Sequence, residues 1–236
     1  GFTAGEKVTT GIQNTLIGAL AGDSLTDADY NVAVGHSALD ADTLGSRSVA
    51  VGTHALTSQN FTSATNTYNV AVGFEAGAAV TTGVKNTFVG GLAGDATTTA
   101  NENTAVGYHS LGTNTTGADN VALGAFSLFN NTTASFNTSV GSSAMETNTT
   151  GANNTAVGYQ SLLSNTTGAQ NTAVGESSMA AITTGQGNTA IGSKSLDAGT
   201  TANDNTALGY KALTTNTTGH YNVAVGKDAL EMATTA

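Results

Sequence analysis

One motif recurs along the whole chain and constrains its fold more than any other feature. It is clearest in Asn154-Thr-Ala-Val-Gly158, which is followed by Asn165-Thr-Thr-Gly168. If the asparagine that opens the motif is called position 0, it recurs thirteen times, and eleven of the twelve intervals are 17 residues. A fixed period over a whole chain is typical of a solenoid or an array, not of a compact globular domain. Position 0 is occupied by Asn14, Asn31, Ser48, Asn69, Asn86, Asn103, Asn120, Asn137, Asn154, Asn171, Asn188, Asn205 and Asn222.

The three residues after position 0 have the pattern of a short strand. Position +1 is Thr or Val, position +3 is Val, Ile or Leu, and position +2 between them is small in eleven repeats. This alternation predicts a strand with two distinct faces, as in Thr155 to Val157. Position +4 is Gly in all thirteen repeats. An unvarying Gly such as Gly158 predicts a positive φ or a close backbone approach, at a corner that ends the strand.

A second element follows the corner. Position +7 is Ala or Ser, and position +8 is Leu or Met in ten repeats, as in Ser161-Leu162. We interpret these positions as a second short strand. Thr is then common at positions −5 and −4, and Gly at position −3, as in Thr166 to Gly168. Short polar side chains beside Gly favour a turn, so each repeat is predicted to form one coil.

Stacked coils predict an all-β protein, a repetitive parallel β-solenoid or β-roll of about 13 coils of 17 residues, with residues 1–236 as one domain. The chain begins and ends within a repeat, so we expect a segment of a longer polypeptide. The single longer interval places an insertion within residues 57–68. Such a loop is either a tolerated bulge or a binding loop. The expected structural ladder is represented by Asn154, Val157, Gly158, Leu162, Thr166 and Gly168.

The composition narrows the classes of partner. There are 16 acidic and 6 basic residues, a formal net charge of −10, which argues against nucleic-acid binding. The chain has no Cys and no 18-residue apolar run, so neither disulfides nor membrane insertion is expected. Charged residues are only 9% of the chain. A surface hydrated by Thr, Ser and Asn favours an extracellular or virion-exposed fibre. The core of one chain would be thin, which favours association with other chains.

No catalytic site is evident in the sequence. Asp23, Asp27, Asp29, Asp40 and Asp42 gather in the early coils, and they are either a calcium site or a solvated acidic face. The four histidines form no ligand pair, although one His per chain could form an axial ring in a trimer. Ser, His and Asp form no nucleophile constellation. We therefore expect no enzyme activity, no catalytic residues, no metal and no cofactor. The histidines are His36, His54, His109 and His220.

Aromatic residues are the candidates for ligand contact. Tyr108, Tyr159 and Tyr210 all occupy position +5, three repeats apart. Their rings could stack on sugars, or they could pack against the next coil or chain. Phe61, in the insertion, is a further candidate for ligand contact. Asn-x-Thr sequons also recur, and we interpret them as by-products of the turn, not as glycosylation sites. They begin at Asn114, Asn148, Asn165 and Asn216, among others.

The motif itself resembles known repeats. Asn154–Gly158, Asn188–Gly192 and Asn222–Gly226 resemble the β-roll repeats in the head domains of trimeric autotransporter adhesins. The 17-residue form, with Asn-Thr-Thr-Gly between motifs, looks more like the repeats of bacteriophage tail-fibre and appendage proteins. The resemblance implies a homotrimer of left-handed parallel β-rolls, in which small residues such as Ala156 allow close packing.

The expected function is that of a structural fibre segment, a virion tail fibre or tail-associated fibre that displays a host-attachment tip. Its expected partners are two further copies of itself, other fibre or tail components, and a host surface glycan or protein. Its expected location is the virion, or the extracellular space and cell surface. One alternative is a bacterial surface adhesin that binds matrix or glycan. Another is a single chain that forms an extracellular filament end to end. A fibre-borne depolymerase would need carboxylates that converge in a groove.

Overall fold

The structure, a computed structural model, describes residues 1–234 and is a parallel β-solenoid. No helix is present in the described residues, and none of them forms a segment able to cross a membrane as a helix. The strands recur at the 17-residue period of the sequence, which confirms the predicted fold class. The chain divides into two compact units, residues 1–119 and 120–236. Each unit is described by itself below.

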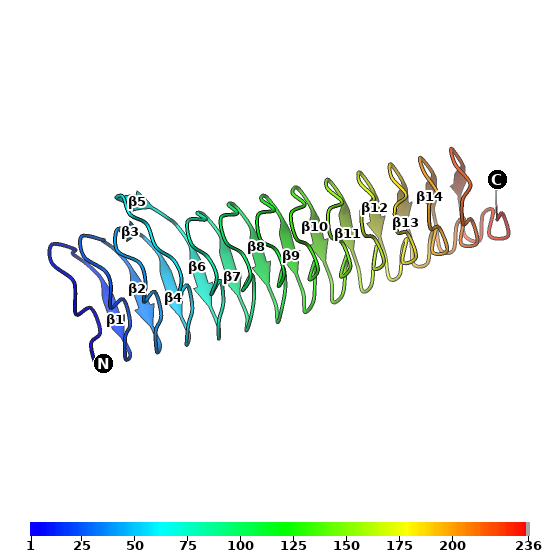
Figure 1. Cartoon of the computed structure of the whole chain (residues 1–236). Helices are drawn as coiled ribbons and strands as arrows, with labels where there is room; N and C mark the ends of the chain where they lie inside the picture. The colour runs from blue at the N-terminus through cyan, green and yellow to red at the C-terminus, as the bar shows by residue number, and fades with distance from the viewer. Residues whose placement is uncertain (235–236) are drawn as a thin grey trace. The chain divides into compact units, whose positions relative to one another are not determined.

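The first unit contains six three-residue strands in one parallel sheet, in the order β1-β2-β4-β6-β7-β8 (Figure 1). A separate pair, β3 (Gly45–Ser46) and β5 (Thr65–Asn66), is also parallel, and β5 lies within the predicted insertion. The insertion is therefore an ordered addition to the coil. The six strands are β1 (Thr15–Ile17), β2 (Val32–Val34), β4 (Val49–Val51), β6 (Val70–Val72), β7 (Thr87–Val89) and β8 (Thr104–Val106).

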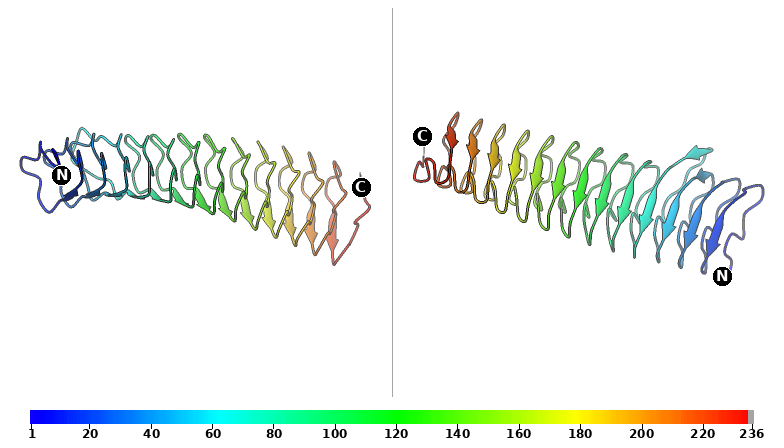
Figure 2. Two further views of the ribbon diagram at one scale, coloured as in Figure 1. Left: turned by 90° about the horizontal axis from the view of Figure 1, so that it is seen from below. Right: turned by 180° about the vertical axis from the view of Figure 1, so that it is seen from behind.

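The second unit contains seven three-residue strands in sequential order, from β9 to β15 (Figure 2). Their register follows the repeat, because Thr155 pairs with Thr172 and Val157 with Val174. Equivalent residues therefore lie directly above one another. The strands are β9 (Val121–Leu123), β10 (Thr138–Val140), β11 (Thr155–Val157), β12 (Thr172–Val174), β13 (Thr189–Ile191), β14 (Thr206–Leu208) and β15 (Val223–Val225).

The strand ends at the predicted glycine corner. Gly158 has φ +133°, and a Cβ at this position would lie 2.6 Å from the carbonyl oxygen of Gly175 in the next coil. Only Gly accommodates both the positive φ and the close approach of the two backbones. The prediction for position +4 is confirmed, and position +4 has a positive φ in all thirteen repeats.

The second element is not a strand, and that prediction was wrong. Gln160 and Leu162, at positions +6 and +8, both have φ +53°, in the left-handed region. The N–H of Ser161 donates to Gly158 O at 3.3 Å, and the N–H of Asn165 donates to Leu162 O at 3.3 Å. The segment is therefore a run of overlapping turns. In the first turn the positive φ is at the third residue, as in a type II turn.

This turn segment still forms backbone hydrogen bonds with the preceding coil and with the following coil. The N–H of Gln160 donates to Ser142 O in the preceding coil, and the N–H of Leu162 donates to Ser178 O in the following coil. The left-handed residues therefore direct successive N–H groups toward opposite coils. These inter-coil bonds, together with burial of the position +8 side chain, offset the strain of positive φ at non-glycine residues.

The interior of each coil is narrow, and two of the positions that fill it face each other across the coil. The position +2 alanine, such as Ala156, and the position +8 side chain, such as Leu162, are fully buried. Ala156 therefore packs inside its own coil. The exceptions in the sequence are explained by volume: the large position +2 residues, Leu16 and Phe88, lie against glycines at position +8.

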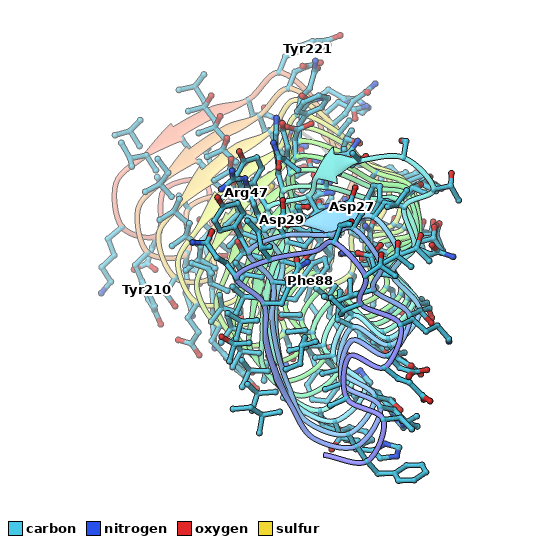
Figure 3. All side chains as sticks on the ribbon, turned by 90° about the vertical axis from the view of Figure 1, so that its left-hand side faces the viewer. Asp27, Asp29, Arg47, Phe88, Tyr210 and Tyr221 are labelled. Carbon is cyan, nitrogen blue, oxygen red and sulfur yellow. The ribbon has the colours of Figure 1, made fainter. Side chains whose placement is uncertain are left out.

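Phe88 and Leu16 occupy the space that a position +8 side chain fills elsewhere. A Cβ on Gly94 would lie 2.5 Å from Phe88 Cε1, and one on Gly77 would lie 2.9 Å from Phe88 Cδ2. A Cβ on Gly22 would lie 2.7 Å from Leu16 Cδ2. Figure 3 shows Phe88 inside the coil, where it is fully buried. Large and small residues thus alternate across the core to keep it filled.

The position 0 asparagines form a buried ladder that links one coil to the next. The N–H of Asn171 donates to Asn154 Oδ1 at 2.9 Å, and Asn171 Nδ2 donates to Gly185 O at 2.8 Å. Asn171 Oδ1 in turn accepts the N–H of Asn188 at 3.0 Å. One side chain therefore satisfies two buried backbone groups of the following coil. The position 0 amides thus pair with the backbone of the turn.

Candidate functional site

The outer face of the sheet is the most distinctive surface of each unit. Because position +2 points inward, positions +1 and +3 both point outward, and they are partly or largely exposed in every strand. No charged residue occupies either position. The large apolar residues on this face include Ile17, Val72, Val106, Leu123, Ile191, Leu208 and Val225, with exposed fractions of 36–65%. Monomeric proteins rarely expose contiguous apolar surface of this kind.

The sequence pattern showed which residues alternate, but not which face of the strand is inside. The small position +2 residue is the signal that could have settled it. Only Ala and, in one repeat, Ser occur opposite a position +8 Leu or Met, because the coil has no room for more. The β-branched positions, which a globular protein would bury, are consequently on the surface here.

The early acidic residues do not converge. Asp23 forms an ion pair with Lys7 at 3.2 Å. Asp27 accepts the hydroxyl of Thr10, and Asp29 accepts a backbone N–H. Among residues 1–234 no group of three His, Asp or Glu side chains could hold a metal ion. Asp27 is exposed, Asp23, Asp29 and Asp40 are partly buried, and only Asp42 is fully buried.

Asp42 is fully buried beneath the insertion, at the centre of a polar network. Its Oδ1 accepts the N–H groups of Gly45 and Phe61, and its Oδ2 accepts Gln59 Nε2 at 2.6 Å. Burial raises the pKa of Asp42, while these three hydrogen bonds act to lower it. The carboxylate ties the insertion to the coil below it, which is a structural role.

The same network explains why Ser48 interrupts the asparagine ladder. Ser48 Oγ lies 2.6 Å from Thr67 Oγ1 and accepts Gln59 Nε2 at 2.8 Å. Gln59 Oε1 accepts Asn69 Nδ2 at 2.8 Å, so the buried glutamine continues the ladder across the insertion. Serine is short enough to leave room for the Gln59 side chain. Ser48, the one position 0 residue that is not Asn, was the feature of the sequence that could have indicated this network.

The histidines do not form a ligand set either. The His36 and His54 rings contact each other, with centroids 5.6 Å apart, and His54 Nδ1 lies 3.7 Å from Glu75 Oε1. Over the described residues there is no cavity or pocket to hold a substrate.

The predicted ligand-contact residues differ in accessibility. Tyr108 lies in the first unit and is 52% exposed. Tyr159 and Tyr210 lie in the second unit and are 53% and 46% exposed (Figure 3 labels Tyr210). Phe61 is only 7% exposed, because its backbone is held against Asp42 and Leu44. Phe61 therefore offers no ring to a ligand, and that prediction is not supported.

The four sequon asparagines named above are buried. Asn148 and Asn165 are fully buried, and Asn165 Nδ2 donates to Asn148 Oδ1 at 2.8 Å and to Gly168 O at 2.9 Å. Asn114 and Asn216 are also fully buried. A glycan cannot be accommodated at these nitrogens in the folded coil. This agrees with the interpretation of the sequons as part of the turn.

Comparison with known proteins gives no relative: no family model, no curated protein and no solved structure matches the chain. The fold itself defines the class, which is a parallel β-solenoid built from a 17-residue repeat. Function must therefore be argued from the surfaces described above.

Proposed function

We propose that this chain is a structural fibre segment that associates as a homotrimer, in a virion tail fibre or tail-associated fibre that displays a host-attachment tip. The observation that supports this best is the uncharged, largely apolar outer face of the sheet. A second copy of the chain is a suitable occupant, because it carries the same β-branched rows at the same spacing of about 4.8 Å. Other fibre or tail components are the further partners.

Association through this face would compensate for the thin interior. The apolar side chains that the coil of Asn154 buries are one Ala and one Leu, Ala156 and Leu162, and the other buried side chains beside them are polar. Ile191 and Leu208, by contrast, are 40% and 44% exposed at the surface of the single chain. Each Å² of apolar surface removed from water contributes about 25 cal/mol, so burying every strand's outer residues adds stability along the whole repeat.

The ladders supply what a fibre needs mechanically. Backbone hydrogen bonds link each coil to its neighbours at the strand, at the turn segment and at the Thr-Thr turn, as at Thr166 N–H to Thr183 O. The buried asparagines add side-chain bonds between the same coils. Bending a unit would break several of these bonds at once, so each unit resists bending.

A bacterial surface adhesin is the second candidate. The half-exposed rings of Tyr159 and Tyr210 favour it, since aromatic faces bind sugars and protein side chains. Loss of adhesion in a Tyr159→Ala, Tyr210→Ala variant that keeps its oligomeric mass would favour this candidate. Retained adhesion would remove these rings as its binding site.

The fibre proposal is tested by charging the sheet face. Ile191→Lys places an ammonium on an outward position that is already 40% exposed, so a single chain should tolerate it. In a trimer it would bury three charges, and the assembly should dissociate. Thr184→Lys, at an exposed position outside the sheet, is the matched control and should leave the mass unchanged. Equal masses for the two variants in sedimentation velocity would argue against this interface.

A further inference from the structure

Arg47 lies at a position where its neighbours hold it in one orientation. It is the only arginine in the chain. Its guanidinium lies over the ring of Tyr30, with Cζ 4.6 Å from the ring centroid, and its Nε donates to Asn66 Oδ1 at 3.0 Å. Tyr30 belongs to the preceding coil and Asn66 to β5 of the insertion. The stacked ring and the hydrogen bond together restrict the side chain, although Arg47 itself is exposed.

The outer end of the guanidinium remains available. Within residues 1–234 Arg47 forms no ion pair, and neither does Lys194, whereas the other four basic residues each pair with a carboxylate. The hydrogen bond to Asn66 uses Nε. The two terminal nitrogens of a guanidinium match the two oxygens of a planar carboxylate. Fixing the side chain before binding lowers the entropy cost of that contact.

An exposed aromatic ring follows one coil further on. Tyr68 occupies the same repeat position as Arg47 and is 53% exposed. The two residues lie in register, because the N–H of Thr67 donates to Ser46 O just before them. Neighbouring coils are about 4.8 Å apart, close to the length of one pyranose ring. A sugar bound through its carboxylate at Arg47 therefore places an adjoining sugar ring beside Tyr68.

The insertion itself contributes polar, uncharged side chains to this surface. Asn60, Thr62, Ser63 and Asn66 are exposed there and can exchange hydrogen bonds with hydroxyl groups. Asp29 lies close by, since its carbonyl accepts the N–H of Arg47 (Figure 3). With a net charge of −10 the chain repels ligands of high negative charge density. This combination favours an oligosaccharide with isolated carboxylates over nucleic acid or polyphosphate.

We propose that Arg47, Tyr68 and the polar edge of the insertion form a binding site for a carboxylate-bearing oligosaccharide. Arg47 binds the carboxylate through its terminal nitrogens. Tyr30 and Asn66 are positioning residues that hold the guanidinium. Tyr68 provides the apolar face for the neighbouring sugar ring. The site lies within the first unit and goes beyond the proposed fibre function, since it requires no second copy of the chain.

Binding to the whole chain is measured by isothermal titration calorimetry and by saturation-transfer NMR. The probes are trigalacturonate, a glucuronate disaccharide and sialyllactose, together with the methyl ester of trigalacturonate and a triglutamate peptide. We expect saturable binding of at least one acidic sugar and none of the ester or the peptide. Absence of binding by all three acidic sugars would overturn the proposal. Equal binding of the ester would overturn the role of the carboxylate, and equal binding of the peptide would overturn the assignment to a sugar.

Matched variants locate the site. Arg47→Gln should abolish binding, and Arg47→Lys should weaken it at least about tenfold, because the bidentate contact is lost while the charge remains. Lys227→Gln makes the same change in net charge at a lysine of the second unit and should bind normally. Tyr68→Ala should weaken binding, whereas Tyr221→Ala, at the same repeat position in the second unit, should not. Unchanged binding in Arg47→Gln would overturn the site whatever the oligomeric mass proves to be.

Discussion

A large side chain at position +2 is accompanied by Gly at position +8, and this compensation predicts how substitutions at the two positions change the free energy of unfolding. Phe88 is fully buried, and it fills space above two glycines, Gly77 and Gly94. Phe88→Ala restores the residue that most coils have at position +2, but leaves both position +8 sites empty. Large-to-small changes of a buried Phe cost about 3–5 kcal/mol. The upper part of this range is expected, because the flanking backbones are held by inter-coil hydrogen bonds and cannot collapse into the space.

Enlarging position +8 while Phe88 is kept should also lower the free energy of unfolding. Gly94→Leu places a Cβ 2.5 Å from Phe88 Cε1, at a backbone with φ +59°. Overpacking of this kind costs about 1–3 kcal/mol or more. The left-handed φ is not itself prohibitive, since Leu111 and Leu128 have φ +55° and +52° at the same repeat position. The penalty should therefore come mainly from contact with the Phe88 ring.

Combining the changes should recover stability. The triple variant Phe88→Ala, Gly77→Leu, Gly94→Leu rebuilds the core of the common coil, and we expect it within about 1.5 kcal/mol of the parent protein, as for other volume-conserving swaps. Each free energy of unfolding would be measured by urea titration, with the m value checked for constancy. Additive losses in the combined variant, without recovery, would refute the packing explanation.

Two further predictions concern the ladder and the buried carboxyls. Asn171→Ala removes partners from Gly185 O and from the N–H of Asn188, and should lower the free energy of unfolding by about 2–5 kcal/mol. The control Thr184→Ala, at an exposed position, should change it by less than about 0.5 kcal/mol. A loss below about 1 kcal/mol in Asn171→Ala would contradict the structural role of the asparagine ladder. Burial raises the pKa of four carboxyls above the ordinary value of 3.8, so the folded state holds protons that the unfolded state has released. Their favourable contribution is present at low pH and is lost as the pH rises above 3.8 and through the raised pKa values, so calorimetry should give a melting temperature that falls as the pH rises through this window, less steeply in Asp197→Asn. A melting temperature that rises over this range would contradict the sign. The four are Asp40, Asp42, Asp95 and Asp197.

The sequence was sufficient to predict the strand and its glycine corner. Both depend on local rules: alternation of β-branched residues over Thr155 to Val157, and a backbone approach at Gly158 that no Cβ allows. The conformation of the second element of the repeat could not be predicted from such local rules. Leu162 looks like a strand residue, but its φ is left-handed because the coil must turn there while keeping its inter-coil bonds. Glycine at the same position in three repeats, as at Gly94, was the available signal.

The candidate sites were harder to predict, because they depend on which face of the coil is inside. Phe61 was a candidate for ligand contact in the sequence, yet a hydrogen bond from its N–H to Asp42 Oδ1 holds it at only 7% exposure. Arg47 has no motif around it. Its orientation arises only when the preceding coil supplies Tyr30 and the insertion supplies Asn66, at separations of 17 and 19 residues. Contacts at such distances follow from the stacking, not from local sequence.

The central claim is that copies of this chain associate through the outer face of the sheet. Its most direct test is the mass of the purified chain by multi-angle light scattering over a dilution series. We predict a stable mass of three times 23.2 kDa at every concentration. A mass of 23.2 kDa throughout the series would contradict the trimeric fibre.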